Sequence, residues 1–227
     1  MQIFCDFDGT ISVEDATDLV LSRFADPKWE DIEAQWKQGL IGSAECMRQQ
    51  IALINATKRD LDSFLDTVSI DPGFRDFLFF CEDRKIPMTI VSDGVDYFIR
   101  RILARHGIHG LPIISNTLTC HTVAGRDVYT LLSPFRERDC FSGAGVCKCQ
   151  VVRDVGQQIY IGDGRSDFCV SDKVDIVLAK SKLAEYCLGQ GIPFSRFHDF
   201  TDLLPTLKAM LHDMPRPLRA AKYPTIA

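Results

Sequence analysis

Two pairs of aspartates, Asp6 with Asp8 and Asp163 with Asp167, carry the side chains best suited to chemistry in this sequence. Each pair follows a short apolar run of the kind that forms a buried strand. If those strands are neighbours, the four carboxylates repel one another in a partly desolvated cleft. A divalent cation relieves this repulsion, and ligands that are all oxygen favour Mg²⁺, which commonly bridges carboxylates to a phosphate. The aspartates therefore predict a Mg²⁺ site for a phosphorylated substrate.

Ser92, Asp93 and Gly94 form a small polar group directly before an expected helix. Unpaired backbone amides and the positive end of a helix dipole favour phosphate oxygens at such a position. Lys148, at the start of a further helical stretch, can neutralise both a phosphate and a nucleophile with its point charge. These residues predict a phosphate cradle beside a cationic side chain.

Each feature taken alone has a more ordinary interpretation. An Asp-x-Asp at a strand end is typical of a turn that caps a helix, Ser92 of a helix N-cap, and Lys148 of a solvated helix surface. Cys147 and Cys149 flank Lys148, but Cys-x-Cys without a second pair or a histidine cluster favours packed or partly exposed thiols over a metal or redox pair. The order and spacing of the whole set favour catalysis.

The elements that must position these side chains alternate along the chain. Apolar runs bounded by polar turns predict strands, and amphipathic stretches between them predict helices. The alternation of strands and helices predicts a parallel sheet of the α/β class. Because strand–helix–strand crossovers are almost always right-handed, we expect the helices to cover both faces of the sheet in a three-layer, doubly wound arrangement. Polar loops at the carboxyl ends of its strands would share one crevice. Strands are expected over residues 2–6, 87–91, 111–115, 158–161 and 175–179, and helices over residues 95–106 and 149–155.

Residues 12–71 interrupt this alternation with a long interval that has no strand pattern. Ordinary connections between a strand and a helix span only about 2–6 residues, so we expect a helical insertion that packs as a small bundle and covers the site. Its helical periods fall at residues 18–24, 32–36, 46–54 and 61–68. The predicted organisation is a core of residues 1–12 and 72–213, a helical cap of residues 13–71 and a C-terminal tail of residues 214–227, with a β-hairpin and loop within residues 117–145.

Composition excludes several classes of protein. The chain has 227 residues, 46% of them hydrophobic, and a formal net charge of −5, so it lacks the attraction to phosphates that nucleic-acid binders need. Its apolar runs are shorter than the ~20 residues that cross a bilayer, which predicts no membrane span. Nine cysteines, an odd number, without a signal peptide predict reduced thiols and a cytoplasmic protein. We expect a monomer or homodimer whose partner is a small phosphorylated metabolite.

Four motifs occur in order along the chain. They are Asp6-x-Asp8-Gly9-Thr10, Ser92, Lys148 and Gly162-Asp163-Gly164-x-x-Asp167. This set resembles the motifs of the haloacid dehalogenase (HAD) superfamily of phosphohydrolases, and the helical interval after the first motif resembles the cap of that superfamily. The resemblance covers residues 2 to 179. It implies a Mg²⁺-dependent phosphoric monoester hydrolase with a Rossmann-like core.

The resemblance also implies a role for each matched residue. Asp6 would attack phosphorus to form an aspartyl phosphate, and Asp8 would protonate the leaving alkoxide and later activate water. Thr10 and Ser92 would position phosphate oxygens, while Lys148 and Mg²⁺ would screen the negative charge. The implied metal ligands are the carboxylates of Asp6 and Asp163, the backbone carbonyl of Asp8, and Asp167 directly or through water.

Within the superfamily, the chain resembles the branch that contains phosphoserine phosphatases and a methionine-salvage phosphatase. Phosphoserine phosphatases usually hold their substrate with a Glu nine residues after the nucleophile and an Arg in the cap, and the matching positions here are Asp15 and Gln50. Gln50 has no guanidinium fork for a carboxylate. Arg48 would have to compensate from a position that faces another direction on its helix. These differences disfavour an amino-acid substrate.

Other local features resemble the salvage enzyme, which acts on 2-hydroxy-3-keto-5-methylthiopentenyl 1-phosphate. They include residues 24–29 and the cysteine-rich stretch around Lys148. Asp93 stands where glycine is common in both groups, and an extra carboxylate weakens anion binding unless its side chain faces away. The favoured substrate is therefore the salvage phosphate, with phosphoserine or another small phosphorylated metabolite as the alternative.

Two classes without turnover remain as alternatives. A phosphoacceptor signalling module also combines a doubly wound sheet, aspartates, Mg²⁺ and a lysine, but it would lack the long helical insertion and an acid two residues after the nucleophile. A non-catalytic phospholigand-binding protein would be expected to have lost motif residues, and all are present here. Both alternatives are disfavoured.

Overall fold

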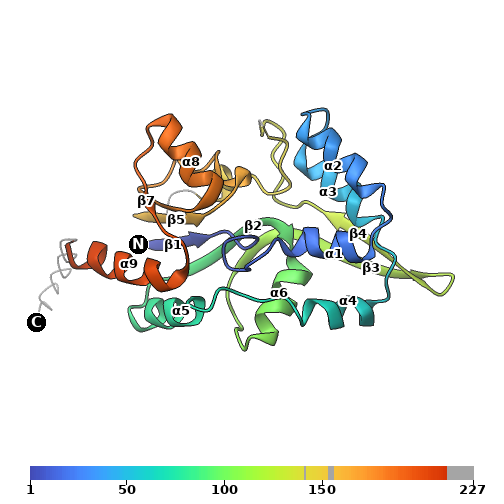
Figure 1. Ribbon diagram of the computed structural model, residues 1–227, viewed down its shortest axis with the longest axis horizontal. Helices are drawn as coiled ribbons and strands as arrows, with labels where there is room; N and C mark the ends of the chain where they lie inside the picture. The colour runs from blue at the N-terminus through green and yellow to red at the C-terminus, as the bar shows by residue number, and fades with distance from the viewer. Residues whose placement is uncertain (141, 153–155, 214–227) are drawn as a thin grey trace, which may run out of the picture.

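The strands of the protein form one mainly parallel sheet in a computed structural model, which describes residues 1–140, 142–152 and 156–213 (Figure 1). The strands are β1 (Gln2–Cys5), β2 (Met88–Val95), β3 (Ile113–Val123), β4 (Arg126–Leu132), β5 (Gln158–Gly162), β6 (Ile176–Ala179) and β7 (Ser195–Arg196). Their order across the sheet is β4-β3-β2-β1-β5-β6-β7. β3 and β4 pair antiparallel, and the other pairings of the described strands are parallel. The predicted α/β class is confirmed.

The direction of winding changes at β1. This strand pairs with β2 on one side and with β5 on the other, and the chain then extends the sheet outward from each. Ligands of open α/β sheets bind outside the carboxyl ends of the strands where the order reverses. The ends of β1, β2 and β5 therefore mark the place where a site is expected.

Helices cover both faces of the sheet. They are α1 (Ala16–Phe24), α2 (Trp29–Lys37), α3 (Ser43–Ile51), α4 (Lys58–Leu65), α5 (Phe74–Asp83), α6 (Asp96–Arg105), α7 (Lys148–Val151), the 3₁₀ turn η1 (Arg165–Asp167), α8 (Ser181–Gln190) and α9 (Phe200–Asp213). α5, α6 and α9 lie on one face and α8 on the other (Figure 1). Successive side chains of a strand point to opposite faces of the sheet. In β1, Ile3 and Cys5 belong to the large cluster under α5, α6 and α9, whereas Phe4 belongs to a smaller cluster on the opposite face.

The five strands expected from the sequence are all present, but β2 continues through Ser92 and Gly94 to Val95 instead of ending at residue 91, and β3 continues to Val123 instead of ending at residue 115. The expected hairpin is formed by β3 and β4, whose turn lies at Ala124 and Gly125. The helix expected over residues 95–106 is α6. The helix expected over residues 149–155 overlaps α7, which begins at Lys148 and ends at Val151, and residues 153–155 lie outside the described part of the chain. The predicted tail, residues 214–227, also lies outside it.

The helical insertion after β1 is confirmed and consists of α1 to α4. It differs from the expectation in one respect, because it does not hold a hydrophobic core of its own. Leu21 of α1 and Leu61 of α4 belong to the same buried cluster as Phe98 of α6 and Tyr129 of β4. The insertion therefore packs against α6 and the β3–β4 hairpin rather than as a separate bundle.

Two helices near the carboxyl end complete the fold without having been predicted. In α9, Phe200 packs edge-on against Phe74 and Phe77 of α5, with ring centroids 5.0 Å apart in both pairs. The Asp71 carboxylate accepts hydrogen bonds from the backbone amides of Phe200 and Gly73.

Within the described residues, no helix combines the length and apolar character needed to span a membrane.

Candidate active site

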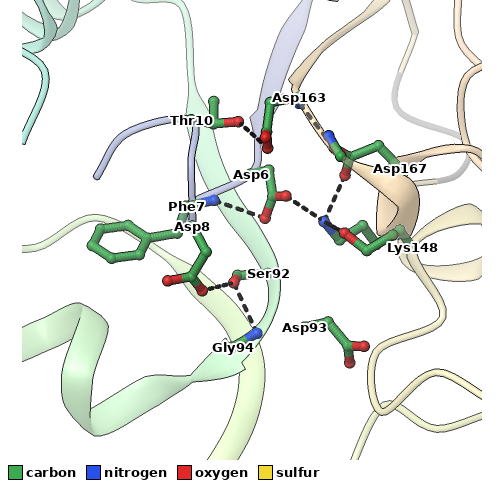
Figure 2. Close-up of polar contacts among 12 residues, drawn as sticks. Asp6, Phe7, Asp8, Thr10, Ser92, Asp93, Gly94, Lys148, Asp163 and Asp167 are labelled. Carbon is green, nitrogen blue, oxygen red and sulfur yellow. Dashed lines mark hydrogen bonds and ion pairs between the residues drawn. The ribbon is translucent and has the colours of Figure 1, made fainter. Parts of the chain in front are cut away.

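The carboxylates of Asp6, Asp163 and Asp167 meet at the carboxyl ends of β1 and β5 (Figure 2). These strands are parallel neighbours in which Cys5 pairs with Ile161, so each strand ends beside the other. One carboxylate oxygen from each aspartate lies within 4.8 Å of the other two. Oxygen donors at this spacing fit a hard divalent cation such as Mg²⁺. The structure thus brings together three of the four aspartates singled out from the sequence.

Lys148 supplies the positive charge of this cluster. Its Nζ lies 2.9 Å from Oδ2 of Asp6 and 2.6 Å from Oδ1 of Asp167, and it also donates to the Ser166 hydroxyl at 3.0 Å. The side chain is fully buried. Burial alone would lower the pKa of Lys148, but the charges of Asp167 and Asp6 raise it further than burial lowers it. The lysine therefore stays cationic between the two carboxylates.

Asp167 is the most tightly held carboxylate of the cluster. Oδ1 accepts a hydrogen bond from the Tyr160 hydroxyl at 2.5 Å, and Oδ2 accepts from the amides of Asp163 and Gly164 at 3.0 Å each. Neither Tyr160 nor Ser166 was predicted from the sequence. A tyrosine in an otherwise apolar buried strand was the available signal, because a buried hydroxyl needs a hydrogen-bonding partner.

Asp8 has different surroundings from the other aspartates. Oδ1 accepts from the backbone amide of Ala16 at 2.9 Å, and Oδ2 accepts from the Ser92 hydroxyl at 3.4 Å. Gly94 donates its amide to that hydroxyl at 2.9 Å, and a Cβ at Gly94 would collide with the Asp8 carboxylate. Burial, reinforced by the charge of Asp15, raises the pKa of Asp8. A carboxyl with a raised pKa keeps its proton more readily and is suited to donate it.

The Asp6 carboxylate is subject to opposing influences on its pKa. Burial and the neighbouring charge of Asp167 raise its pKa, whereas Lys148 lowers it. The backbone amide of Phe7 donates to Oδ1 of Asp6 at 2.7 Å, while Oδ2 faces Lys148. Burial and Asp167 likewise raise the pKa of Asp163. Within this cluster, the cationic charge of Lys148 is what favours the ionised form of Asp6.

Asp93 does not point toward the other carboxylates (Figure 2). Its carboxylate accepts from the Ser43 hydroxyl at 2.5 Å, from the Val146 amide at 2.9 Å and from the Asn116 side-chain amide at 3.3 Å. These three donors compensate the charge. Asp93 therefore leaves the space beside Ser92 free of an extra carboxylate and joins β2 to α3 and to the loop before Lys148.

Thr10 and Asp15 lie close to the cluster but contact protein groups. The Thr10 hydroxyl donates to Oδ1 of Asp163 at 3.0 Å, and the Thr10 carbonyl accepts from Nζ of Lys180 at 3.3 Å. Asp15 caps α1 by accepting from the amide of Asp18 at 2.9 Å. Thr10 thus orients a carboxylate of the acidic cluster, and Asp15 begins the first helix of the insertion.

Gln50 and Arg48 make hydrogen bonds with other residues of the helical insertion. Gln50 is buried, and its amide donates to the Trp29 carbonyl at 3.3 Å and to the Glu33 carboxylate at 3.1 Å. Arg48 forms an exposed two-bond pair with Glu45 on the same helix. Within the described residues, neither side chain contacts a residue of the acidic cluster.

The fold is that of HAD-like hydrolases. Solved structures share the fold across most of the chain. A phospho-aspartyl intermediate analogue of phosphoserine phosphatase superposes with a TM-score of 0.66 at 14% identity, covering 91% of this chain and 97% of that one. A HAD family hydrolase from Salmonella enterica serovar Typhi gives a TM-score of 0.68 at 20% identity and covers 89% and 69% of the two chains.

The chain belongs to the family described as "Putative Phosphatase", whose sequence profile matches residues 1–183. A relative from Geobacillus kaustophilus is 30% identical over 216 residues, which cover 92% of this chain and 96% of the relative. Another from Lysinibacillus sphaericus is 30% identical over 226 residues, with 94% and 97% coverage. Both relatives are named 2-hydroxy-3-keto-5-methylthiopentenyl-1-phosphate phosphatase. The protein is accordingly a phosphoric monoester hydrolase.

Proposed function

We propose that this phosphatase hydrolyses the phosphate monoester of a small metabolite in two steps, with the phosphoryl group carried on Asp6. The observation that carries the proposal is the position of the Asp6 carboxylate, whose Oδ2 lies 2.9 Å from the buried Nζ of Lys148. A carboxylate attacks phosphorus only when the repulsion between the two anions is screened. Lys148 would provide part of that screening at the point of attack.

Asp8 is the proposed acid and base. In the first step a bond forms between Asp6 and phosphorus, the bond to the leaving oxygen breaks, and Asp8 gives that oxygen its proton. In the second step Asp8 takes a proton from water, which attacks phosphorus and releases inorganic phosphate from Asp6. Ser92 supports this role, because its hydroxyl orients Oδ2 of Asp8. Ser92 and the amides of Asp93 and Gly94 are the proposed contacts of the phosphate oxygens, and the Gly94 amide would exchange its bond to the Ser92 hydroxyl for a phosphate oxygen.

Mg²⁺ is the proposed cofactor, held by the carboxylates of Asp6, Asp163 and Asp167 and by the backbone carbonyl of Asp8. The donor set fits, since all side-chain donors are oxygens and one from each aspartate lies within 4.8 Å of the others. When bound, the cation would supply further screening of charge between phosphate and nucleophile. Thr10 would keep Asp163 oriented toward it through the bond to Oδ1.

The proposed substrate is 2-hydroxy-3-keto-5-methylthiopentenyl 1-phosphate. Support comes from the names of relatives that match nearly the whole chain at 30% identity. It also comes from the helical insertion, where Gln50 is occupied between α2 and α3 and Arg48 is paired with Glu45. Neither offers a free guanidinium for the carboxylate of phosphoserine, which is the second candidate because of the shared fold.

Residues 13–71 are proposed to act as a cap over the phosphate end of the substrate, and the enzyme is proposed to work in the cytoplasm as a monomer or homodimer. The Ser43 hydroxyl supports the first point, because it contacts Asp93 next to Ser92. Nine free cysteines are compatible with a reducing compartment.

Trapping of the phosphoenzyme tests the mechanism. Asp6→Asn should reduce turnover by about 10⁵-fold or more, because it removes the nucleophile. Asp8→Asn should accumulate a hydroxylamine-sensitive phosphoenzyme that the wild type turns over. Asp83→Asn, an exposed change on α5, is the control and should behave as wild type. Near-normal turnover of Asp6→Asn would refute the nucleophile, whereas a stable phosphoenzyme in the wild type would favour a phosphoacceptor.

Comparison of substrates tests the specificity. Rates of phosphate release should be measured with the salvage phosphate, phosphoserine and several sugar phosphates at saturating Mg²⁺. We expect kcat/KM for the salvage phosphate to exceed that for phosphoserine by at least about 100-fold, since an unpaired buried carboxylate costs several kcal/mol. A preference for phosphoserine would reject the proposed substrate but keep the reaction class.

A further inference from the structure

Two thiols lie in contact on either side of Lys148. The Sγ atoms of Cys147 and Cys149 are 3.5 Å apart. Cys147 is buried, whereas Cys149 is partly exposed and so is open to small solutes. Burial and the neighbouring thiols, first Cys149 and then Cys140, raise the pKa of Cys147. Cys149 is therefore the thiol of this pair that a solute can reach.

Cys147 and Cys149 belong to the short segment that holds Lys148. Cys147 is the N-cap of α7, and this short helix begins with Lys148. The buried Nζ of Lys148 reaches Asp6 and Asp167 at 2.9 Å and 2.6 Å. Any change in the backbone between the two cysteines must move Lys148, since it is the residue that joins them.

We infer that Cys147 and Cys149 form a reversible oxidation site for hydrogen peroxide, and that a disulfide between them switches the phosphatase off. Peroxide first oxidises the Cys149 thiol to a sulfenic acid and is reduced to water. The Cys147 sulfur then attacks the Cys149 sulfur, the S–O bond breaks, and a second water leaves with the thiol proton. In total, two thiols and one peroxide give one disulfide and two waters.

The effect on activity follows from the length of the new bond. A disulfide needs an S–S distance of about 2.05 Å, so the two sulfurs, 3.5 Å apart in the thiol form, must approach one another. α7 has only four residues. The backbone amide of Cys147 donates a hydrogen bond to the Phe135 carbonyl, which holds the start of this helix in place. The part of this approach that rotation of the two cysteine side chains does not supply therefore falls on the backbone of Lys148, the residue that joins them. A catalytic group displaced by about 1 Å can lose about 100-fold in rate, and this consequence rests on the proposed function.

Digestion with trypsin reads the disulfide directly. Cleavage after Arg138, Lys148 and Arg153 places Cys147 and Cys149 in separate peptides, residues 139–148 and 149–153. After treatment with one equivalent of hydrogen peroxide and alkylation, we expect these peptides to appear joined, with two of the nine thiols lost. Dithiothreitol should separate them. Because residues 139–148 also contain Cys140, Cys140→Ser should still give the joined peptides, and Cys147→Ser should not.

Phosphatase rates measured on the same samples, with p-nitrophenyl phosphate as substrate, test the switch. The wild type should lose activity by about 100-fold on oxidation and recover it with dithiothreitol. Cys149→Ser should keep its activity in peroxide, whereas Cys120→Ser, which lacks an exposed thiol of β3, should lose it as the wild type does.

Absence of the joined peptides from oxidised wild type would overturn the inference. So would equal loss of activity in Cys149→Ser, or joined peptides with unchanged activity. Failure of the proposed function is distinguishable, because it would show as near-normal turnover by reduced Asp6→Asn enzyme, while the peptides would still report whether the disulfide forms.

Discussion

At the scale of single residues, identical carboxylates differ because each has a different partner. Asp6 faces the Lys148 cation, Asp8 faces a hydroxyl, and the Asp93 carboxylate is held by three donors away from the site. An opposite charge favours the ionised form of an acid, and burial without one favours the protonated form. The same side chain can therefore serve as a nucleophile, an acid or a structural bridge.

Replacement of Lys148 by an uncharged residue tests whether its charge favours the ionised carboxylates. Lys148→Met should lower kcat by about 10²–10³-fold, the loss typical of one charge-stabilising donor. It should also lower the free energy of unfolding by about 3–5 kcal/mol, because two buried carboxylates lose their partner. Steady-state rates and urea unfolding measure the two effects. Lys173→Met, which removes an exposed lysine paired with Asp172, should change neither. Wild-type turnover by a folded Lys148→Met protein would contradict the assignment.

At the scale of elements, contacts between distant segments decide where the site residues lie. The Ser43 hydroxyl of α3 meets Asp93 at the end of β2, and the Gly143 carbonyl accepts from the amide of Ala44. α3 is thus fastened both to the sheet and to the loop before Lys148. The helical insertion and the core meet at the second motif.

The bond from Ser43 should contribute measurably to stability. Ser43→Ala removes a hydrogen bond to a carboxylate, so we expect a loss of about 1.5–3 kcal/mol in the free energy of unfolding. Ser63→Ala on α4 is the control, since its hydroxyl is exposed and bonds a carbonyl of its own helix. That variant should stay within about 0.5 kcal/mol of wild type. Equal denaturation midpoints for both variants would show that the bond contributes nothing.

The packing of α9 on α5 should also contribute to the free energy of unfolding. Phe200→Ala should cost about 3–5 kcal/mol, because it empties the buried contact with Phe74 and Phe77. Phe79→Ala, also in α5 but 71% exposed, should change stability by less than about 0.5 kcal/mol. Guanidinium unfolding monitored by circular dichroism gives both values. A small effect of Phe200→Ala would mean that α9 is not part of the cooperative core.

At the scale of the whole molecule, one hydrophobic cluster extends from the sheet into the helical insertion. Mg²⁺ binding at the acidic cluster should therefore raise the free energy of unfolding of the whole fold. At a Mg²⁺ concentration 100 times the dissociation constant, a ligand of the native state adds about 2.7 kcal/mol, which corresponds to a rise of about 5–10 °C in Tm for a chain of this size. EDTA should remove the rise.

Differential scanning fluorimetry measures this shift without any assay of activity. Asp163→Asn is expected to reduce it strongly, because one carboxylate of the donor set becomes neutral. Asp172→Asn, an exposed aspartate, should retain it. An unchanged Tm in Mg²⁺, for a protein that is active only with Mg²⁺, would place the metal on the substrate rather than in the acidic cluster.

The sequence by itself determined the class of fold and the arrangement of the motifs. Alternating apolar runs and amphipathic stretches predicted the parallel strands, and aspartates at strand ends predicted where charges would gather. These inferences succeeded because strand direction and period are local properties of the chain. α9 was not predicted, since it contains Pro205, which lowers helix propensity, and is stabilised by aromatic contacts with a helix more than 100 residues away.

Only the tertiary structure decided where individual side chains point. It turned Asp93 toward Ser43, bonded Thr10 to Asp163, buried Gln50 between two helices and left Arg48 exposed with Glu45. It also placed the Cys147 and Cys149 sulfurs in contact and joined the insertion to the core. Residue type and spacing do not contain this information, because the direction of a side chain depends on partners supplied by distant segments of the folded chain.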